Sequence, residues 1–264
     1  MIESIPDNQI ANIIKNMSKK SKSFKEFFAY ANKNLELKEK PIHWLYDPEL
    51  LVADGKARPP RDIVLRIHPS ELNKNNNFFL IAHEIGHLIQ FEKYCPPIRF
   101  RMSNMGFRGE DEKQINGLLN SMIFDFSVNV KLQEYGIKIP FPHYGPPEEK
   151  DLRIFNLGYI FRYVLFQRYS LQVDEENEND IRVCLEKYQN SDLVTVGNRI
   201  VKIINNSTLT GIPEKINKSE VKSVLEEIFV NLENYFTKSP YEDSFKIIVH
   251  QEGSSQFLIQ KTEI

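Results

Sequence analysis

Residues 80–89 read Leu80-Ile81-Ala82-His83-Glu84-Ile85-Gly86-His87-Leu88-Ile89, so two histidines and a glutamate interrupt an otherwise apolar run. The run lies within residues 78–94, which are apolar and long enough to predict a helix of about four turns before the prolines at 96 and 97. Histidines four residues apart lie on one side of a helix, one turn from each other. His83 and His87 can therefore bind one tetrahedral metal ion, and Glu84 can reach a metal-bound water without ligating the metal.

The motif predicts a zinc site because polar side chains in the middle of an apolar helix cost free energy when they are buried without partners. A bound metal removes that cost. In hydrolytic sites of this kind the metal acidifies its water, and a neighbouring carboxylate takes the proton. We therefore expect one Zn²⁺ ion on His83 and His87, with Glu84 as the general base and then the proton shuttle. Because the chain has only two cysteines, we expect nitrogen and oxygen atoms, and not sulfur, to bind the zinc ion.

A third protein ligand is needed, and Asp125 is the strongest candidate. It lies in the apolar segment 122–128, although aspartate has a poor helix propensity and is rarely buried unless it is paired. Asn129 follows one helical turn later and could orient Asp125 or a neighbouring histidine.

Other third ligands remain open. A further histidine in the same helix would fall near position 93, which is a lysine. His143 lies in a proline-rich loop, and its spacing gives it no support. Glu110 and Glu112 lie in the first turn of a helix predicted over 110–135, where the helix dipole alone already favours acidic residues.

These residues resemble a known class of enzyme. His83-Glu84-Ile85-Gly86-His87 resembles the zincin metallopeptidases, and Asp125-Phe126-Ser127-Val128-Asn129 resembles the Asp-x-x-x-Asn signature of the metallopeptidase domain associated with von Willebrand factor A-like proteins. The resemblance covers residues 60–136, about a third of the chain. It implies a zincin fold, hydrolysis of peptide bonds in a peptide or protein substrate, and Asp125 as the third ligand.

A second family, the ImmA/IrrE-type metallopeptidases, is the runner-up. Glu112-Lys113-Gln114-Ile115-Asn116 is similar to its ligand-bearing helix and would make Glu112 the third ligand. The small residues expected after that segment are replaced by Leu118 and Leu119, which weakens the match.

The zincin resemblance implies two further parts of an active site. An edge strand is expected above the active-site helix, where an extended peptide can add to it, and Ile63–Ile67 is the best candidate. A tyrosine, histidine or arginine outside the ligand set is expected to stabilise the transition state. Tyr135, the basic segment 99–108, His143 and Tyr144 are available, and we favour His143 and Tyr144 because their loop is flanked by glycine and proline.

The remaining chain reads as mainly helical. The resulting prediction is an α+β protein with a zincin-like core near 40–136, a small edge sheet, an active-site helix and a helical C-terminal region. We expect residues 1–150 to form the metallopeptidase domain and residues 151–264 a helical region, either separate from it or packed on it as one unit. The expected elements are helices at 8–18, 23–34, 151–169, 180–190, 191–204 and 214–236, strands at 41–46 and 62–67, non-regular segments at 53–61 and 98–109, and a hairpin of 245–249 with 256–260.

Composition excludes several classes. The 264 residues carry 34 basic and 36 acidic side chains, a near-neutral balance that argues against a dedicated nucleic-acid binder. No apolar run is long enough to span a bilayer, and the first seven residues lack the basic and then apolar pattern of a signal peptide. We therefore expect a cytoplasmic protein that binds neither membrane nor nucleic acid. The alternative function is a non-catalytic interaction or regulatory protein on a zincin scaffold with a structural or relic metal site, whose partner would bind the C-terminal helices.

Overall fold

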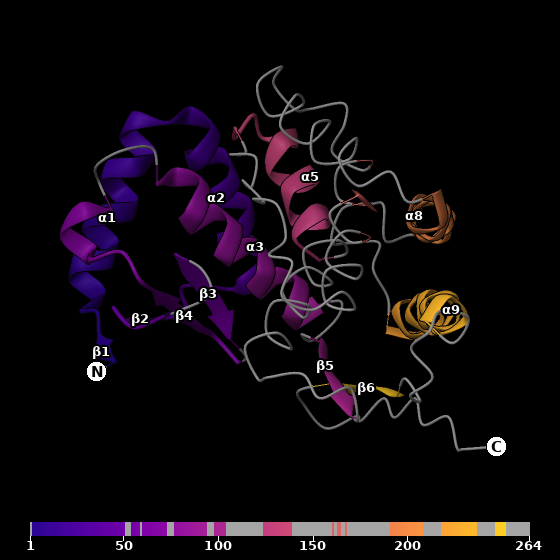
Figure 1. Ribbon diagram of the computed structural model, residues 1–264. Coiled ribbons are helices and arrows are strands. Elements are labelled where there is room, and N and C mark those ends of the chain that lie inside the picture. The colour runs from indigo at the N-terminus through magenta and orange to yellow at the C-terminus, as the bar shows by residue number, and fades with distance from the viewer. Residues whose placement is uncertain are drawn as a thin grey trace. The chain divides into compact units, whose positions relative to one another are not determined.

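The fold is α+β and mostly helical with a small mixed sheet, as the sequence predicts (Figure 1). A computed structural model describes residues 2–50, 54–58, 60–72, 77–93, 98–103, 124–138, 160, 163, 164, 167, 191–207, 218–236 and 246–251. The chain forms two compact units, the first of Met1–Pro96, Asp125–Pro140 and Gly211–Lys215 and the second of the remainder. The boundary expected near residue 150 lies outside the described residues.

The described part of the first unit contains four α-helices: α1 (Asp7–Lys20), α2 (Lys22–Leu35), α3 (Phe78–Lys93) and α5 (Phe126–Glu134). The helices expected at 8–18 and 23–34 are confirmed as α1 and α2. The side chain of Ser21 accepts a hydrogen bond from the backbone N–H of Phe24 at 3.1 Å, which caps the start of α2. The helix expected at 78–94 is confirmed as α3. Of the helix expected at 110–135, the described part is α5, preceded by a π-helical turn at residues 124 and 125.

A four-stranded sheet lies in the same unit, in the order β1-β2-β4-β3. Its strands are β1 (Glu3–Ser4), β2 (His43–Tyr46), β3 (Gly55–Arg58) and β4 (Asp62–Leu65), and a short 3₁₀ helix, Pro69–Glu71, follows β4. β2 and β4 are parallel, whereas the outer pairs are antiparallel. Two expectations were wrong: β4 is a central strand rather than the edge, and 53–61 is not a loop throughout, since β3 forms the edge beside β4.

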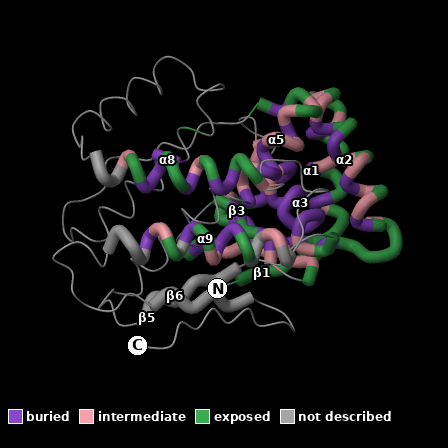
Figure 2. The backbone as a smooth tube through the Cα atoms, turned by 90° about the vertical axis from the view of Figure 1, so that its right-hand side faces the viewer, coloured by how far each residue is buried: buried purple, intermediate pink, exposed green. Residues whose placement is uncertain are grey.

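The core of the first unit gathers around α3. Nine residues of this helix are buried, and Figure 2 shows the helix as buried over much of its length. Ile63 and Leu65 of β4 belong to the same apolar cluster as Phe24 and Phe27 of α2. Arg61, just before β4, donates to the backbone oxygen of Leu35 at 2.8 Å and to Glu92 of α3 at 2.9 Å. These bonds join the end of α2, the start of β4 and the end of α3.

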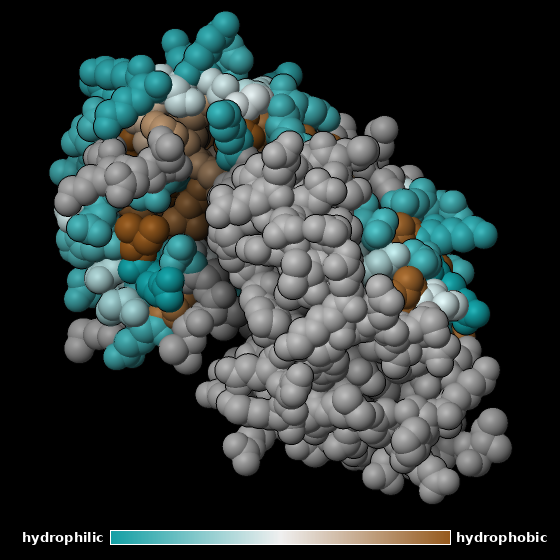
Figure 3. All heavy atoms as spheres, turned by 45° about the horizontal axis from the view of Figure 1, so that its top comes forward, coloured by the Kyte–Doolittle hydropathy of each residue, from teal (hydrophilic) through white to brown (hydrophobic). Residues whose placement is uncertain are grey.

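Hydrophilic side chains cover much of the outer surface of the first unit in Figure 3, with hydrophobic ones gathered in a smaller area. Across the described residues, the large hydrophobic side chains that stay exposed are Ile2 and Val230. None of the helices in the described ranges is long and apolar enough to cross a membrane.

The second unit contains α8 (Ser191–Asn205), α9 (Lys218–Phe236), and an antiparallel pair of strands, β5 (Ile98–Ser103) and β6 (Lys246–Gln251). The helix expected at 191–204 is confirmed as α8, and the described part of the helix expected at 214–236 is α9. The connection expected at 98–109 is wrong where β5 forms. The tail strand expected at 245–249 forms as β6 and pairs with β5, whereas the other strand of the expected hairpin, 256–260, lies outside the described residues. Helical residues occur at 160, 163, 164 and 167 of the segment 151–169, and 180–190 lies outside the described residues.

α8 and α9 pack on each other through their apolar faces. Gly197 of α8 makes room for the ring of Tyr163, because an added Cβ there would lie 2.5 Å from Cδ1 of that ring. The apolar stripe that the sequence predicts along α9 is buried at the described positions Val224, Leu225, Ile228 and Leu232. A protein partner for the C-terminal helices stays a prediction.

Candidate metal centre

Three potential ligand atoms of the first unit converge, as the sequence predicts. The Nε2 atoms of His83 and His87 lie 3.1 Å apart, and Asp125 Oδ1 lies 3.0 Å from His87 Nε2. All three ligand atoms lie within 4.8 Å of one another. In a tetrahedral zinc site with bonds of about 2 Å, neighbouring ligand atoms are roughly 3.3 Å apart. The group could therefore hold a metal ion.

Two helices bring these ligands together. α3 supplies both histidines because positions i and i+4 share a face. α5 supplies Asp125, which is the residue at its N-terminal cap and is partly exposed. The two helices approach closely at Gly86, where an added Cβ would lie 2.5 Å from Val128 Cγ1. The glycine between the histidines thus lets α5 come near enough to place Asp125 beside His87.

Both histidine rings are also held on the side away from Asp125. His83 Nδ1 lies 2.9 Å from Asn129 Oδ1, and His87 Nδ1 lies 3.1 Å from Gln90 Oε1. An oxygen atom only accepts, so each contact places a proton on Nδ1 and leaves the lone pair of a neutral ring on Nε2. Two nitrogen lone pairs and a carboxylate oxygen then face one another. Such a group requires a positive charge among its atoms, either a proton or a metal ion, and its residues fit a zinc ion.

Aromatic rings continue the stripe of histidines along α3. The centroids of Phe79 and His83 are 5.1 Å apart, and those of His83 and His87 are 4.6 Å apart with the rings nearly perpendicular. Phe91 stacks on His87 at 5.6 Å with an angle of 17° between the rings. The faces of both histidine rings are therefore packed.

Glu84 points from α3 to the edge strand β3. Its Oε2 accepts a hydrogen bond from the backbone N–H of Ala57 at 2.6 Å, and the side chain is buried. Burial raises the pKa of Glu84 to about 7, although the charge of His87 and the Ala57 N–H both act to lower it. Gly55, two residues before Ala57, also lies against Glu84, since an added Cβ would be 3.0 Å from Glu84 Cγ.

The two histidines differ in their affinity for a proton. Burial and the nearby charge of His87 lower the pKa of His83 to about 4. Burial also acts to lower the pKa of His87, but the hydrogen bond and charge of Asp125, together with the charge of Glu84 and the contact with Gln90, outweigh it, so the pKa of His87 is raised. In the metal-free protein the proton of this pair therefore belongs to His87, next to Asp125.

The remaining predicted site residues either lie outside the described residues or make other contacts. Glu110, Glu112, His143 and Tyr144 lie outside the described residues. Tyr135 packs edge-on against Phe27, with ring centroids 5.7 Å apart, in an aromatic cluster. Lys93, where a third histidine of the helix would be, donates to Asn34 Oδ1 at 3.1 Å.

Sequence reasoning missed Gly55, Ala57, Gly86 and Gln90. Gln90 had a detectable signal, because it is a polar residue three positions after His87 in a helix whose other nearby residues are apolar. The contacts of Gly55 and Ala57 depend on strand pairing, which the local sequence does not reveal.

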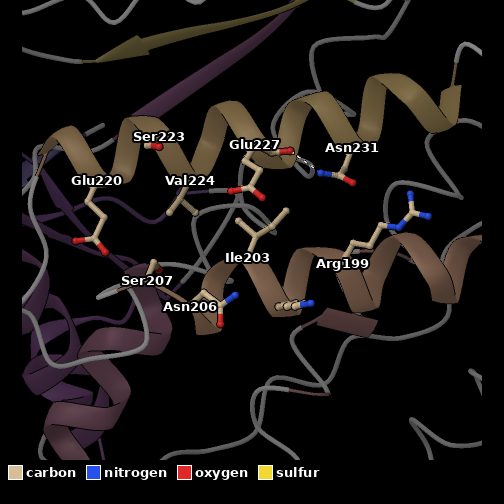
Figure 4. Close-up of a pocket in the computed structure, with 10 residues that line it drawn as sticks. Arg199, Ile203, Asn206, Ser207, Glu220, Ser223, Val224, Glu227 and Asn231 are labelled. Carbon is tan, nitrogen blue, oxygen red and sulfur yellow. Dashed lines mark hydrogen bonds between the residues drawn. The ribbon is translucent and has the colours of Figure 1, made fainter.

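The second unit has a separate groove between α8 and α9, of about 430 Å³ (Figure 4). Ile203 and Val224 point toward one another across it, and both are buried. Asn231 donates to the backbone oxygen of Glu227 at 2.8 Å on its rim. The groove contains none of the predicted site residues, and its rim mixes both charges.

Comparison of the chain with protein-family models, curated proteins and solved structures finds no match. The geometry of the site therefore supplies the argument for function.

Proposed function

We propose that the protein is a zinc-dependent metallopeptidase of the zincin type. The observation that carries the proposal is the convergence of His83 Nε2, His87 Nε2 and Asp125 Oδ1 beside the buried carboxylate of Glu84. His83, His87 and Asp125 would hold one Zn²⁺ ion. When bound, the ion supplies a water of lowered pKa and polarises the substrate carbonyl.

Glu84 is the general base of this proposal. It follows His83 directly on α3, and its carboxylate lies at the interface of α3 with β3. A carboxylate whose pKa burial has raised takes a proton from water more readily than an ordinary glutamate does. The same carboxylic acid then returns the proton to the leaving amine. The hydrogen bond from Ala57 fixes Oε2, so the carboxylate keeps one orientation through both transfers.

The edge strand favours a peptide as the substrate. β3 pairs with β4 on one side, whereas its Ala57 N–H points to Glu84 on the other side. Residues two apart in an antiparallel strand direct their backbone groups the same way, so Gly55 also presents its backbone to this side. Because Glu84 already accepts from the Ala57 N–H, an extended peptide would pair with the other outward backbone groups of β3, those of Gly55 and the carbonyl oxygen of Ala57, and so bring a peptide carbonyl to the zinc site.

The test replaces the base and leaves the ligands in place. The zinc-loaded Glu84→Gln variant should keep about one zinc ion per chain and lose cleavage of a diverse peptide library, followed by mass spectrometry. Glu26→Gln, an exposed change on α2, is the matched control and should cleave like the parent. Cleavage by Glu84→Gln at the parent rate contradicts the assignment of the base. A zinc-loaded parent that cleaves nothing, with a fourth protein ligand on its zinc, favours the non-catalytic alternative.

A further inference from the structure

Gln90 is the one polar side chain of α3 with no exposed area in the described structure. It occurs three residues after His87, on a helix whose neighbouring positions Leu88 and Ile89 are apolar and equally enclosed. Burial of an amide costs free energy unless its hydrogen bonds are made. The presence of a glutamine among these apolar residues therefore points to a use for its polar atoms.

The amide oxygen of Gln90 lies 3.1 Å from His87 Nδ1. This nitrogen is on the side of the ring opposite to Nε2, the atom that faces His83 and Asp125. An oxygen at Nδ1 accepts the proton of that nitrogen and so directs the lone pair of a neutral ring to Nε2. The contact thus selects the form of His87 that can bind a metal.

His83, the other histidine of the metal centre, has an equivalent partner on a different helix. Asn129 of α5 offers its amide oxygen to His83 Nδ1 at 2.9 Å. Each histidine of the metal centre therefore has one buried amide at its outer nitrogen, and the two amides are supplied by two separate helices. Phe91 stacks on the ring of His87, and Gln90 holds the Nδ1 edge of the same ring.

We propose that Gln90 is a positioning residue of the metal centre: it fixes the proton and the rotation of His87 so that Nε2 binds zinc. The inference rests on the metal centre of the proposed function, but not on peptidase activity. Gln90 contacts Nδ1 of His87, the nitrogen opposite to the one that would bind the ion, so its expected effect is on zinc affinity. Loss of the contact should weaken zinc binding by roughly 10- to 100-fold, the usual cost of removing an outer partner of a metal-bound histidine.

The experiment measures the zinc dissociation constant by chelator competition for the full chain and its variants. Gln90→Leu keeps an apolar side chain of similar length and removes the acceptor, and we expect its dissociation constant to rise by roughly 10- to 100-fold. Gln90→Glu keeps an acceptor oxygen at the same reach and should bind zinc at least as tightly as the parent. Leu88→Met, a change of similar volume at a buried position two residues before Gln90, is the matched control and should bind zinc like the parent.

Denaturant unfolding of the metal-free proteins separates positioning from a general effect on the fold. Gln90→Leu should unfold in one cooperative transition at a lower denaturant midpoint than the parent, because the buried Nδ1–H of His87 loses its acceptor, and the zinc dissociation constants are compared under conditions where every variant is folded. A Gln90→Leu variant that binds zinc within twofold of the parent overturns the inference, and so does a Gln90→Glu variant as weak as Gln90→Leu. A parent that binds no zinc overturns the inference together with the metal centre, whereas a parent that binds zinc and cleaves no peptide overturns the proposed function alone.

Discussion

Val128 of α5 occupies the space that a side chain on Gly86 of α3 would need: an added Cβ would lie 2.5 Å from Val128 Cγ1. Gly86 lies between His83 and His87 in the sequence, and Val128 lies between Asp125 and Asn129. The two helices can approach this closely because Gly86 has no side chain. The distance from Asp125 to His87 depends on that approach.

The first prediction concerns Gly86→Ala. Alanine is a better helix former than glycine by about 1 kcal/mol, so a change in an uncrowded helix would stabilise the protein. Here we expect the free energy of unfolding to fall by about 1–3 kcal/mol because the added methyl group collides with Val128. Zinc affinity should fall as well. The double variant Gly86→Ala/Val128→Ala should recover part of both losses, and independent, additive effects in this mutant cycle would contradict the prediction.

The edge strand gives a second prediction. Gly55→Val places a branched side chain against Leu80 and Glu84, since even a single Cβ would lie 2.9 Å from Leu80 Cδ1 and 3.0 Å from Glu84 Cγ. The strand and Glu84 must then separate. We expect kcat for a cleaved peptide to fall by roughly tenfold or more, about 1.4 kcal/mol of barrier, with zinc content unchanged. Steady-state kinetics and elemental analysis of one preparation test this. A lower zinc content, with kcat per zinc-loaded chain equal to that of the parent, would show that β3 supports the ligands instead of the base.

The third ligand gives a third prediction. Asp125→Asn removes the negative charge 3.0 Å from His87 Nε2 and should weaken zinc binding by more than the roughly 10- to 100-fold expected for an outer contact. Competition with a chelator measures the dissociation constant. The same measurement on Glu112→Gln distinguishes the two related families. Loss of zinc from Glu112→Gln but not from Asp125→Asn would replace Asp125 by Glu112 as the ligand.

A fourth prediction concerns protons. His87 has a raised pKa in the metal-free protein because Asp125 stabilises its protonated ring, and zinc needs the neutral ring. In the Glu84→Gln background, which removes the proton that Glu84 carries below about pH 7, zinc binding should release about one proton below the pKa of His87, so the apparent affinity rises with pH until His87 is neutral. Calorimetry in two buffers of different ionisation enthalpy gives the number of protons released. An affinity that does not change with pH would mean that His87 carries no proton in the metal-free site.

A fifth prediction follows from Glu84 in the metal-free protein. Its pKa is about 7 in the folded state and 4.5 in an ordinary glutamate, so between these values the folded state binds more protons than the unfolded state does. The contribution of Glu84 to the free energy of unfolding therefore falls as the pH rises from about 4.5 to about 7, by about 3 kcal/mol.

Glu84→Gln removes this titration. In the presence of a chelator, the stability of Glu84→Gln relative to the parent should increase over that pH range. The shift of His83, which acts in the opposite direction, is common to both proteins and largely cancels in the difference. Denaturant unfolding at four pH values measures the effect. A stability difference that is the same at every pH would contradict it.

The sequence predicts the centre of the site better than its surroundings. Spacing alone places His83 and His87 on one helical face, and an aspartate in an apolar segment identifies Asp125, since both signals are local. The structure brings these three residues together and places Asn129 on His83. The family resemblance, the reaction and the substrate stay predictions.

Non-local pairing explains the errors. β3 has only four residues, Gly-Lys-Ala-Arg, and none of them favours a strand, so its extended form comes from pairing with β4 and from the bond to Glu84. β5 pairs with β6, more than a hundred residues later in the chain. The local sequence of β5, with its basic residues, does not reveal that partner. Whether β4 is central or at the edge also depends on where β3 goes. Gln90 was missed because a single polar residue in an apolar helix ordinarily lies on the exposed side of that helix, whereas Gln90 is buried.

The central claim is a single zinc ion on His83, His87 and Asp125, and anomalous scattering from crystals at the zinc absorption edge tests it most directly. The account predicts one peak per chain within bonding distance of both Nε2 atoms and the Asp125 carboxylate, with a water in the fourth position. No peak in zinc-supplemented crystals, or a peak bound by other residues, would contradict it.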